Sequence, residues 1–81
     1  MLEPQQIENW IAAGLSCAHL VVEGDGHHFQ ALIVSTEFAG LSRVKRQQRV
    51  MQTVRDHLDS GALHALSLQT LTPEEWEAAR G

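Results

Sequence analysis

One segment, residues 27–35, constrains the fold more than any other part of the chain. It reads His-His-Phe-Gln-Ala-Leu-Ile-Val-Ser, and extended backbone would place apolar residues on both of its faces: Phe29, Ala31, Leu32, Ile33 and Val34. A strand with two apolar faces and no internal Pro or Gly is typical of the middle of a sheet, with a neighbour at each edge. The sequence therefore predicts a central strand buried on both faces, which begins at two histidines, His27 and His28.

Two other segments show the alternation of apolar and polar residues that is typical of strands, at residues 18–23 and 63–70. Gly24-Asp25-Gly26 separates the first of them from the central strand and predicts a tight reversal, so these two strands should pair antiparallel. The other segment follows the central strand after 27 residues, most of which have a helical pattern. Such a connection favours a right-handed crossover to a parallel neighbour.

Three helices are expected around this sheet. Residues 4–15 carry apolar side chains at helical spacing, with Pro4 at the first position. Residues 42–58 form the second helix, with Ser42 as N-cap and an apolar arc that contains Gln47 at its centre and the residues Val44, Val50, Met51, Val54 and Leu58. Thr72, Pro73 and Glu75 give the capping box of a third helix. The order α-β-β-α-β-α predicts one α+β domain, residues 1–81, with a three-stranded mixed sheet.

Composition excludes several classes of protein. With 43% hydrophobic and 20% charged residues the chain is an ordinary small globular domain, and no apolar run is long enough to span a bilayer. A single cysteine, Cys17, rules out an intramolecular disulfide and an all-cysteine metal site within one chain. The N-terminus lacks the basic and apolar regions of a signal peptide, so we expect a cytoplasmic protein with no membrane partner.

The histidines suggest a chemical role. If the second and third strands are parallel, both begin at one end of the sheet, where His27 or His28 would lie near His64 at roughly the 4.8 Å spacing of adjacent strands. Two imidazoles can bind one metal ion or cluster but do not complete its coordination, so the missing thiolates would have to come from a partner. The alternative is that these are surface histidines at strand ends. For His19 and His57 we expect surface histidines without a ligand role, and for Cys17 a buried or half-buried structural thiol.

Basic residues raise a second hypothesis. The net charge is −4, yet five of the six basic residues cluster within the second helix: Arg43, Lys45, Arg46, Arg49 and Arg55. Lys45, Arg46 and Arg49 are predicted to project away from the apolar arc, either as a phosphate-binding face or as an ordinary solvated face. No aromatic residue interleaves with them, which argues against stacking on single-stranded bases. No nucleophile motif, phosphate loop or carboxylate pair points to an enzyme.

Three segments together resemble the BolA-like proteins, and within them the IbaG branch: residues 25–29, residues 38–50, and residues 64–76, which read His-Ala-Leu-Ser-Leu-Gln-Thr-Leu-Thr-Pro-Glu-Glu-Trp. The resemblance covers nearly the whole chain. Members nearer BolA itself carry histidine where this chain has Gln47. The resemblance implies a type II KH-like fold, in agreement with the order of elements above.

The resemblance also implies a function. It implies a non-enzymatic partner of a monothiol glutaredoxin, with a 2Fe-2S cluster shared between the glutaredoxin cysteine, glutathione and histidines of this chain. His64 matches the C-terminal ligand of the family, and His28 fits the second ligand better than His27 because it directly precedes Phe29. A role in iron-sulfur or iron homeostasis and acid stress would follow, for a monomer or weak homodimer. Some members are described as DNA-binding regulators, which would map onto residues 42–54.

Overall fold

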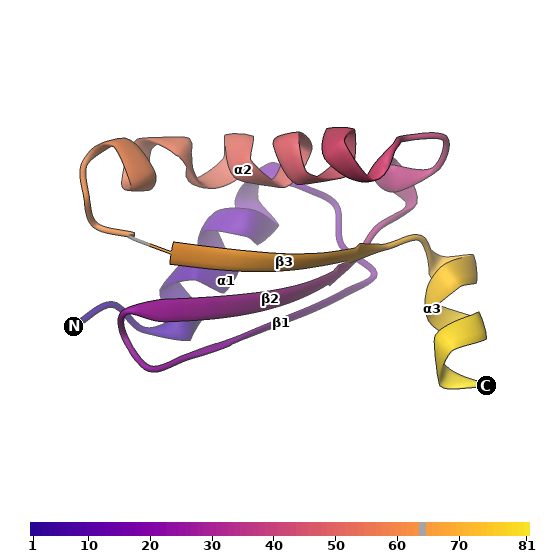
Figure 1. Cartoon of the computed structure of the whole chain (residues 1–81), viewed down its shortest axis with the longest axis horizontal. Coiled ribbons are helices and arrows are strands. Elements are labelled where there is room, and N and C mark those ends of the chain that lie inside the picture. The colour runs from indigo at the N-terminus through magenta and orange to yellow at the C-terminus, as the bar shows by residue number, and fades with distance from the viewer. Residues whose placement is uncertain (64) are drawn as a thin grey trace.

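The computed structural model describes residues 1–63 and 65–81. The elements follow in the predicted order, and a short 3-10 helix is added after the central strand (Figure 1). Their bounds are α1 (Pro4–Gly14), β1 (His19–Gly24), β2 (His28–Val34), η1 (Thr36–Phe38), α2 (Arg43–Asp59), β3 (Ala65–Leu71) and α3 (Pro73–Arg80). The predicted α+β class and order of elements are therefore confirmed.

The sheet has the order β1-β2-β3, with β2 in the middle as predicted. β1 pairs antiparallel with β2, from His19 opposite Val34 to Gly24 opposite Phe29. β3 pairs parallel with β2, from His28 opposite Ala65 to Val34 opposite Leu71. The hairpin turn and the start of β3 consequently lie at the same end of the sheet.

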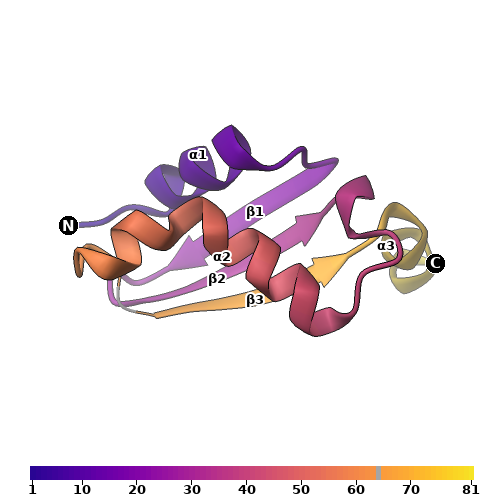
Figure 2. The ribbon, with the colours of Figure 1, turned by 90° about the horizontal axis from the view of Figure 1, so that it is seen from above.

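A single hydrophobic core lies between the sheet and the helices α1 and α2, which both cover one face of the sheet (Figure 2). Fully buried side chains of this core come from both the sheet and the helices: Ile7 and Ile11 of α1, Phe29 and Ile33 of β2, Val50 and Val54 of α2, and Phe38 of η1. Phe38 therefore anchors the connector after β2 in the core. Burial of these apolar side chains is the main stabilising contribution in a domain of this size.

The prediction that β2 is buried on both faces is wrong. Phe29, Ala31 and Ile33 are buried, whereas Gln30 is exposed and Leu32 is only half-buried. Both long helices lie on one face, and α3 lies beyond the end of β3 rather than under the sheet (Figure 1). One face of the sheet thus remains open.

The prediction for the faces of α2 needs two corrections. Val44 was placed on the apolar arc but is 65% exposed, and the Arg46 side chain was placed on the outer face but is only 14% exposed. The fully buried Val50 and Val54 define the centre of the arc. At about 100° per residue, Arg46 lies about 60° from that centre and Val44 about 100° from it.

The predicted caps are present. The Ser42 hydroxyl accepts a hydrogen bond from the Lys45 N–H at 3.2 Å. Thr72 and Glu75 form the reciprocal capping box, with 3.2 Å from the Glu75 N–H to Thr72 Oγ1 and 2.8 Å from the Thr72 N–H to Glu75 Oε1. None of the helices in the described residues has the length and apolar character needed to cross a membrane.

Candidate functional site

The turn between β1 and β2 presents two of the predicted ligands. Asp25 accepts hydrogen bonds at Oδ1 from the backbone N–H groups of His27 and His28, each at 2.9 Å. Gly26 has φ of +102°, which suits glycine in so tight a turn. Gly24 also has to lack a side chain, because a Cβ there would lie 2.6 Å from the His28 carbonyl oxygen. His28 therefore begins β2 in a closely defined hairpin.

His28 lies next to the start of β3. Its Cα partner in the parallel ladder is Ala65, the residue that follows His64 in the sequence. The predicted ligand His64 itself lies outside the described residues. His27 is exposed in the turn, and His28 is exposed at the first position of its strand. The predicted parallel pairing that underlies the histidine hypothesis is confirmed for the strands.

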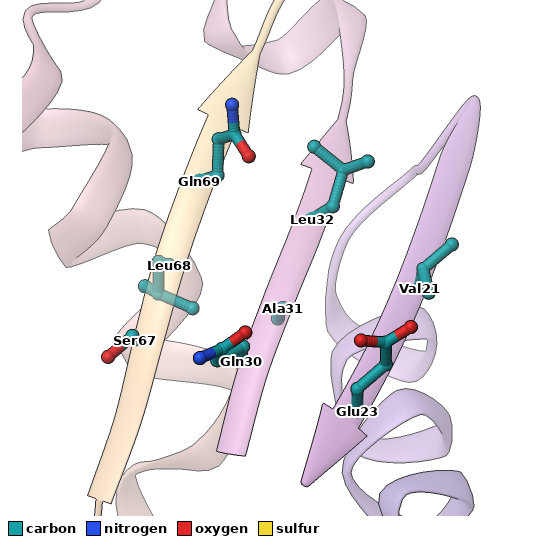
Figure 3. Close-up of a pocket in the computed structure, with 8 residues that line it drawn as sticks. All are labelled: Val21, Glu23, Gln30, Ala31, Leu32, Ser67, Leu68 and Gln69. Atoms are coloured by element: carbon teal, nitrogen blue, oxygen red, sulfur yellow. The ribbon is translucent and has the colours of Figure 1, made fainter. Parts of the chain in front are cut away.

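A groove runs along the open face of the sheet beside His28. It has a volume of about 380 Å³ and is lined by residues of all three strands (Figure 3): Val21, Glu23, Gln30, Ala31, Leu32, Ser67, Leu68 and Gln69. Glu23 and Gln30 also line the smaller hollow that contains Asp25 and His28. Sequence reasoning missed this groove because it predicted both faces of β2 to be covered.

The donor atoms at this end of the sheet fit an incomplete site. Imidazole nitrogens replace cysteine on one iron of some iron-sulfur clusters, so His28 is a chemically suitable ligand. Cys17 precedes β1 at the opposite end of the sheet, since His19 pairs with Val34 there. Burial, and secondly the charge of Glu37, raise the pKa of the Cys17 thiol, which suits a structural cysteine. Among residues 1–63 and 65–81, no three His, Cys, Asp or Glu side chains gather as a metal site.

Two of the five predicted phosphate-binding residues have structural partners instead of lying free on an outer face. Arg46 donates to the carbonyl oxygens of Leu41 and Thr70 at 3.0 and 3.4 Å, and its Nη1 lies 2.6 Å from Glu75 Oε1. This ion pair and the backbone N–H of Thr72 lower the pKa of Glu75 to about 2. Arg46 therefore connects α2 to β3 and α3.

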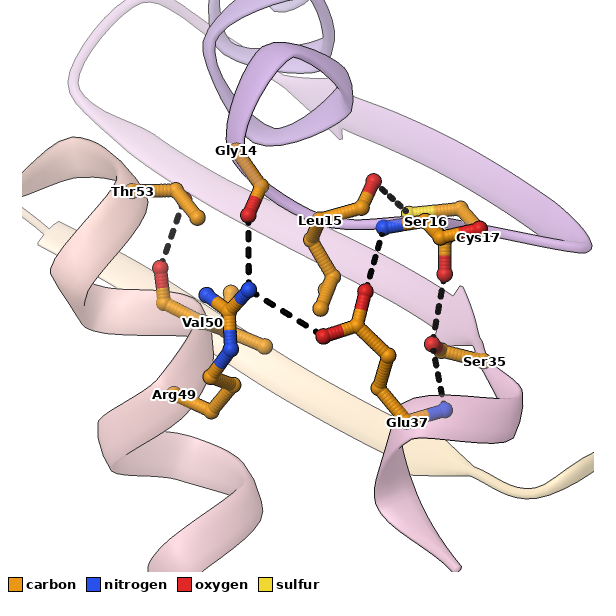
Figure 4. Close-up of polar contacts among 9 residues, drawn as sticks. All are labelled: Gly14, Leu15, Ser16, Cys17, Ser35, Glu37, Arg49, Val50 and Thr53. Atoms are coloured by element: carbon orange, nitrogen blue, oxygen red, sulfur yellow. Dashed lines mark hydrogen bonds and ion pairs between the residues drawn. The ribbon is translucent and has the colours of Figure 1, made fainter.

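Arg49 has a comparable role at the other side of α2. Its Nη2 donates to the carbonyl oxygen of Gly14 at 2.8 Å and lies 3.1 Å from Glu37 Oε1 (Figure 4). Glu37 also accepts a hydrogen bond from the Ser16 N–H at 2.7 Å. Because Gly14 is the last residue of α1, the guanidinium lies where the negative end of the helix dipole favours a cation.

The remaining basic residues form a smaller set. Within the described part of the chain no ion pair involves Arg43, Lys45 or Arg55. Arg43 and Lys45 lie in the first turn of α2 on either side of the exposed Val44, and Arg55 lies near its other end. The predicted cationic face is thus divided rather than continuous.

Two histidines have aromatic partners that the sequence did not predict. His57 of α2 stacks on Trp10 of α1, with ring centroids 3.4 Å apart and 7° between the planes. His19 of β1 stacks on Trp76 of α3, with centroids 5.0 Å apart and 24° between the planes. The two residues of each pair are far apart in the sequence, so no local pattern could reveal them. Both pairs connect separate elements, a structural role that was not expected for these histidines.

Gln47 also has a partner that the sequence could not identify. Its amide nitrogen donates to the carbonyl oxygen of Leu68 on β3 at 3.3 Å. This bond accounts for a polar side chain within the buried arc of α2.

Comparison with known proteins places this geometry in a family. The family model described as BolA-like protein matches residues 5–75. The chain is 37% identical over 79 residues to acid stress protein IbaG of Escherichia coli strain K12, which covers 98% of this chain and 94% of that protein. It is 34% identical to DNA-binding transcriptional regulator BolA of Haemophilus influenzae, over 91% of this chain and 81% of that one.

A solved structure shows the same architecture. The structure of a BolA protein homologue from Coxiella burnetii superposes with a TM-score of 0.86 and 40% sequence identity, and the match covers 95% of this chain and 99% of that one. This superposition agrees with the order of elements and the mixed sheet described above. The chain therefore belongs to the BolA-like family.

Proposed function

We propose that this protein is a non-enzymatic partner that supplies histidine ligands to a 2Fe-2S cluster shared with a monothiol glutaredoxin and glutathione. Its cellular role would be in iron-sulfur or iron homeostasis and the acid-stress response, and the name of the IbaG relative supports the acid-stress part.

One observation carries the proposal. The parallel pairing of β2 with β3 sets His28 opposite Ala65, the neighbour of His64 in the sequence. The candidate ligand His28 thereby lies beside the strand that begins directly after His64 in the sequence. The thiols that a cluster also requires are absent from the described residues at this end, which is consistent with a site that a second protein completes.

The residues of this chain would have defined tasks. His28 and His64 would each donate a neutral imidazole nitrogen to iron, and the shared cluster would provide a redox-active and exchangeable iron centre. The open groove along Glu23 and Gln30 leaves the face of the sheet beside His28 accessible to a partner of protein size. His27 is the alternative ligand from the turn.

The test is to mix the protein with a cluster-loaded monothiol glutaredoxin and to record visible circular dichroism. We expect a changed spectrum for the wild type, no change for His64→Ala, and a weakened change for His28→Ala. His19→Ala is the matched control, because it removes an exposed histidine from the opposite end of the sheet. The proposal would be refuted if the spectrum with the wild type does not change, or if His64→Ala changes the spectrum as much as the wild type does.

A second candidate function is DNA binding through α2, and the name of the Haemophilus influenzae relative favours it. The residues available for phosphate contacts are then Arg43, Lys45 and, near the other end of α2, Arg55, rather than Arg46 and Arg49. The double variant Arg43→Ala/Lys45→Ala should weaken DNA binding and flatten its dependence on salt. If the wild type has no affinity for duplex DNA at low salt, this candidate is excluded.

A further inference from the structure

The turn before β2 uses the Asp25 side chain where many tight turns use the backbone. The Asp25 N–H donates to the His28 carbonyl oxygen at 3.3 Å, which closes the hairpin. The His28 N–H donates to Asp25 Oδ1, and the His27 N–H shares that oxygen. A single carboxylate oxygen therefore binds both histidine amides, in the manner of an Asx turn.

The carboxylate is well suited to hold these amides. One side-chain oxygen accepts both amide hydrogen bonds at 2.9 Å, so the two histidine amides are held by the same atom. Gly26 at φ +102° completes the turn without strain.

We propose that Asp25 is a positioning residue for the ligand His28: it fixes the backbone at His27 and His28 and so the direction in which the His28 imidazole leaves the strand. This inference rests on the proposed function, since it treats His28 as a cluster ligand. Its physical basis is that backbone angles restrict the side-chain rotamers of a residue. Outer groups that orient a metal ligand typically change affinity by about 10- to 100-fold.

Three variants of the full chain test this role in the glutaredoxin titration. Asp25→Ala removes the acceptor, and the glutaredoxin concentration at half-maximal spectral change should rise at least about tenfold. Asp25→Asn keeps an oxygen at the same place without the charge and should titrate like the wild type. Glu74→Ala is the control, because it removes an exposed carboxylate from α3, at the opposite end of the sheet from the turn. Equal weakening by Asp25→Ala and Asp25→Asn, or none by either, would overturn the inference.

A second measurement needs no glutaredoxin and separates this inference from the proposed function. Three-bond couplings in the NMR spectrum of the isolated protein report χ1 of His28. We expect one rotamer in the wild type and in Asp25→Asn, and rotamer averaging in Asp25→Ala. An unchanged coupling in Asp25→Ala would refute the positioning role. If the wild type does not change the circular-dichroism spectrum of the cluster-loaded glutaredoxin, only the proposed function is refuted.

Discussion

Arg46 of α2 and Glu75 of α3 form an ion pair with 2.6 Å between Nη1 and Oε1, although 29 positions separate them in the sequence. The same glutamate completes the capping box of α3, so one side chain both begins that helix and attaches it to α2.

This pair predicts how stability depends on pH. The pKa of Glu75 is about 2 in the folded protein and 4.5 for the unperturbed group. Its stabilising contribution is therefore complete above about pH 4.5 and is lost as the pH falls towards 2. Glu75→Gln, which keeps a capping-box acceptor, should be less stable than the wild type at pH 7, and the difference should shrink in urea unfolding experiments below pH 4. Glu74→Gln is the control, and a difference that does not vary with pH would contradict the prediction.

Arg49 predicts a distinction between a structural and a surface arginine. Arg49→Ala removes the bonds to Gly14 and Glu37, and we expect a loss of about 1 kcal/mol in the free energy of unfolding, a figure reduced for solvent screening because the side chain is 33% exposed. Arg55→Ala removes the same charge and should cost less than about 0.5 kcal/mol. Urea denaturation of both variants measures the difference, and equal losses would show that Arg49 stabilises only through its net charge.

The stack of His57 on Trp10 predicts a spectroscopic signature. The prediction is tested in a Trp76→Phe background, where Trp10 is the only tryptophan. There His57→Ala should shift the tryptophan emission to longer wavelength, because the indole becomes exposed to water. The same change should cost about 1 kcal/mol of stability. His19→Ala in that background should leave the emission unchanged. If His57→Ala leaves the emission wavelength unchanged, the stack does not persist in solution.

Gln47 predicts the effect of reversing one hydrogen bond. Gln47→Glu preserves the size of the side chain but sets an acceptor against the Leu68 carbonyl oxygen, so we expect a loss of about 1 to 3 kcal/mol at pH 7. Gln48→Glu makes the same substitution at the adjacent position, which has no such bond within the described residues, and should be nearly neutral. Thermal unfolding compares the two, and similar melting temperatures would contradict the assignment.

Local patterns predicted the elements well. The alternation in β1 and β3, the glycines of the hairpin, and the caps at Ser42 and Thr72 each depend on neighbours within a few positions, and the structure confirms them. The parallel pairing of β2 and β3 followed from the length of the connection between them. These features are set by short-range physical chemistry, which a single sequence displays.

The wrong predictions concern burial and side-chain partners, which depend on packing between segments that are distant in the sequence. Whether the second face of β2 is covered depends on where α1 and α2 come to lie, which the apolar pattern of β2 does not specify. Likewise, Arg46 and Arg49 appeared free because their partners Glu75 and Glu37 are distant in the sequence. The histidine site was predicted only to the level of strand pairing and, for its function, from the family resemblance; the role of Asp25 required the turn geometry.

The bonds from α2 to β3 have a consequence for association between molecules. β3 is an edge strand, and the carbonyl oxygens of Leu68 and Thr70 on its outer side already accept hydrogen bonds from Gln47 and Arg46. A strand of another molecule that paired with β3 at this edge would need these two carbonyl oxygens as hydrogen-bond acceptors, and both already accept a hydrogen bond from α2. The second helix thus protects this margin of the sheet from the edge-to-edge pairing through which exposed strands aggregate.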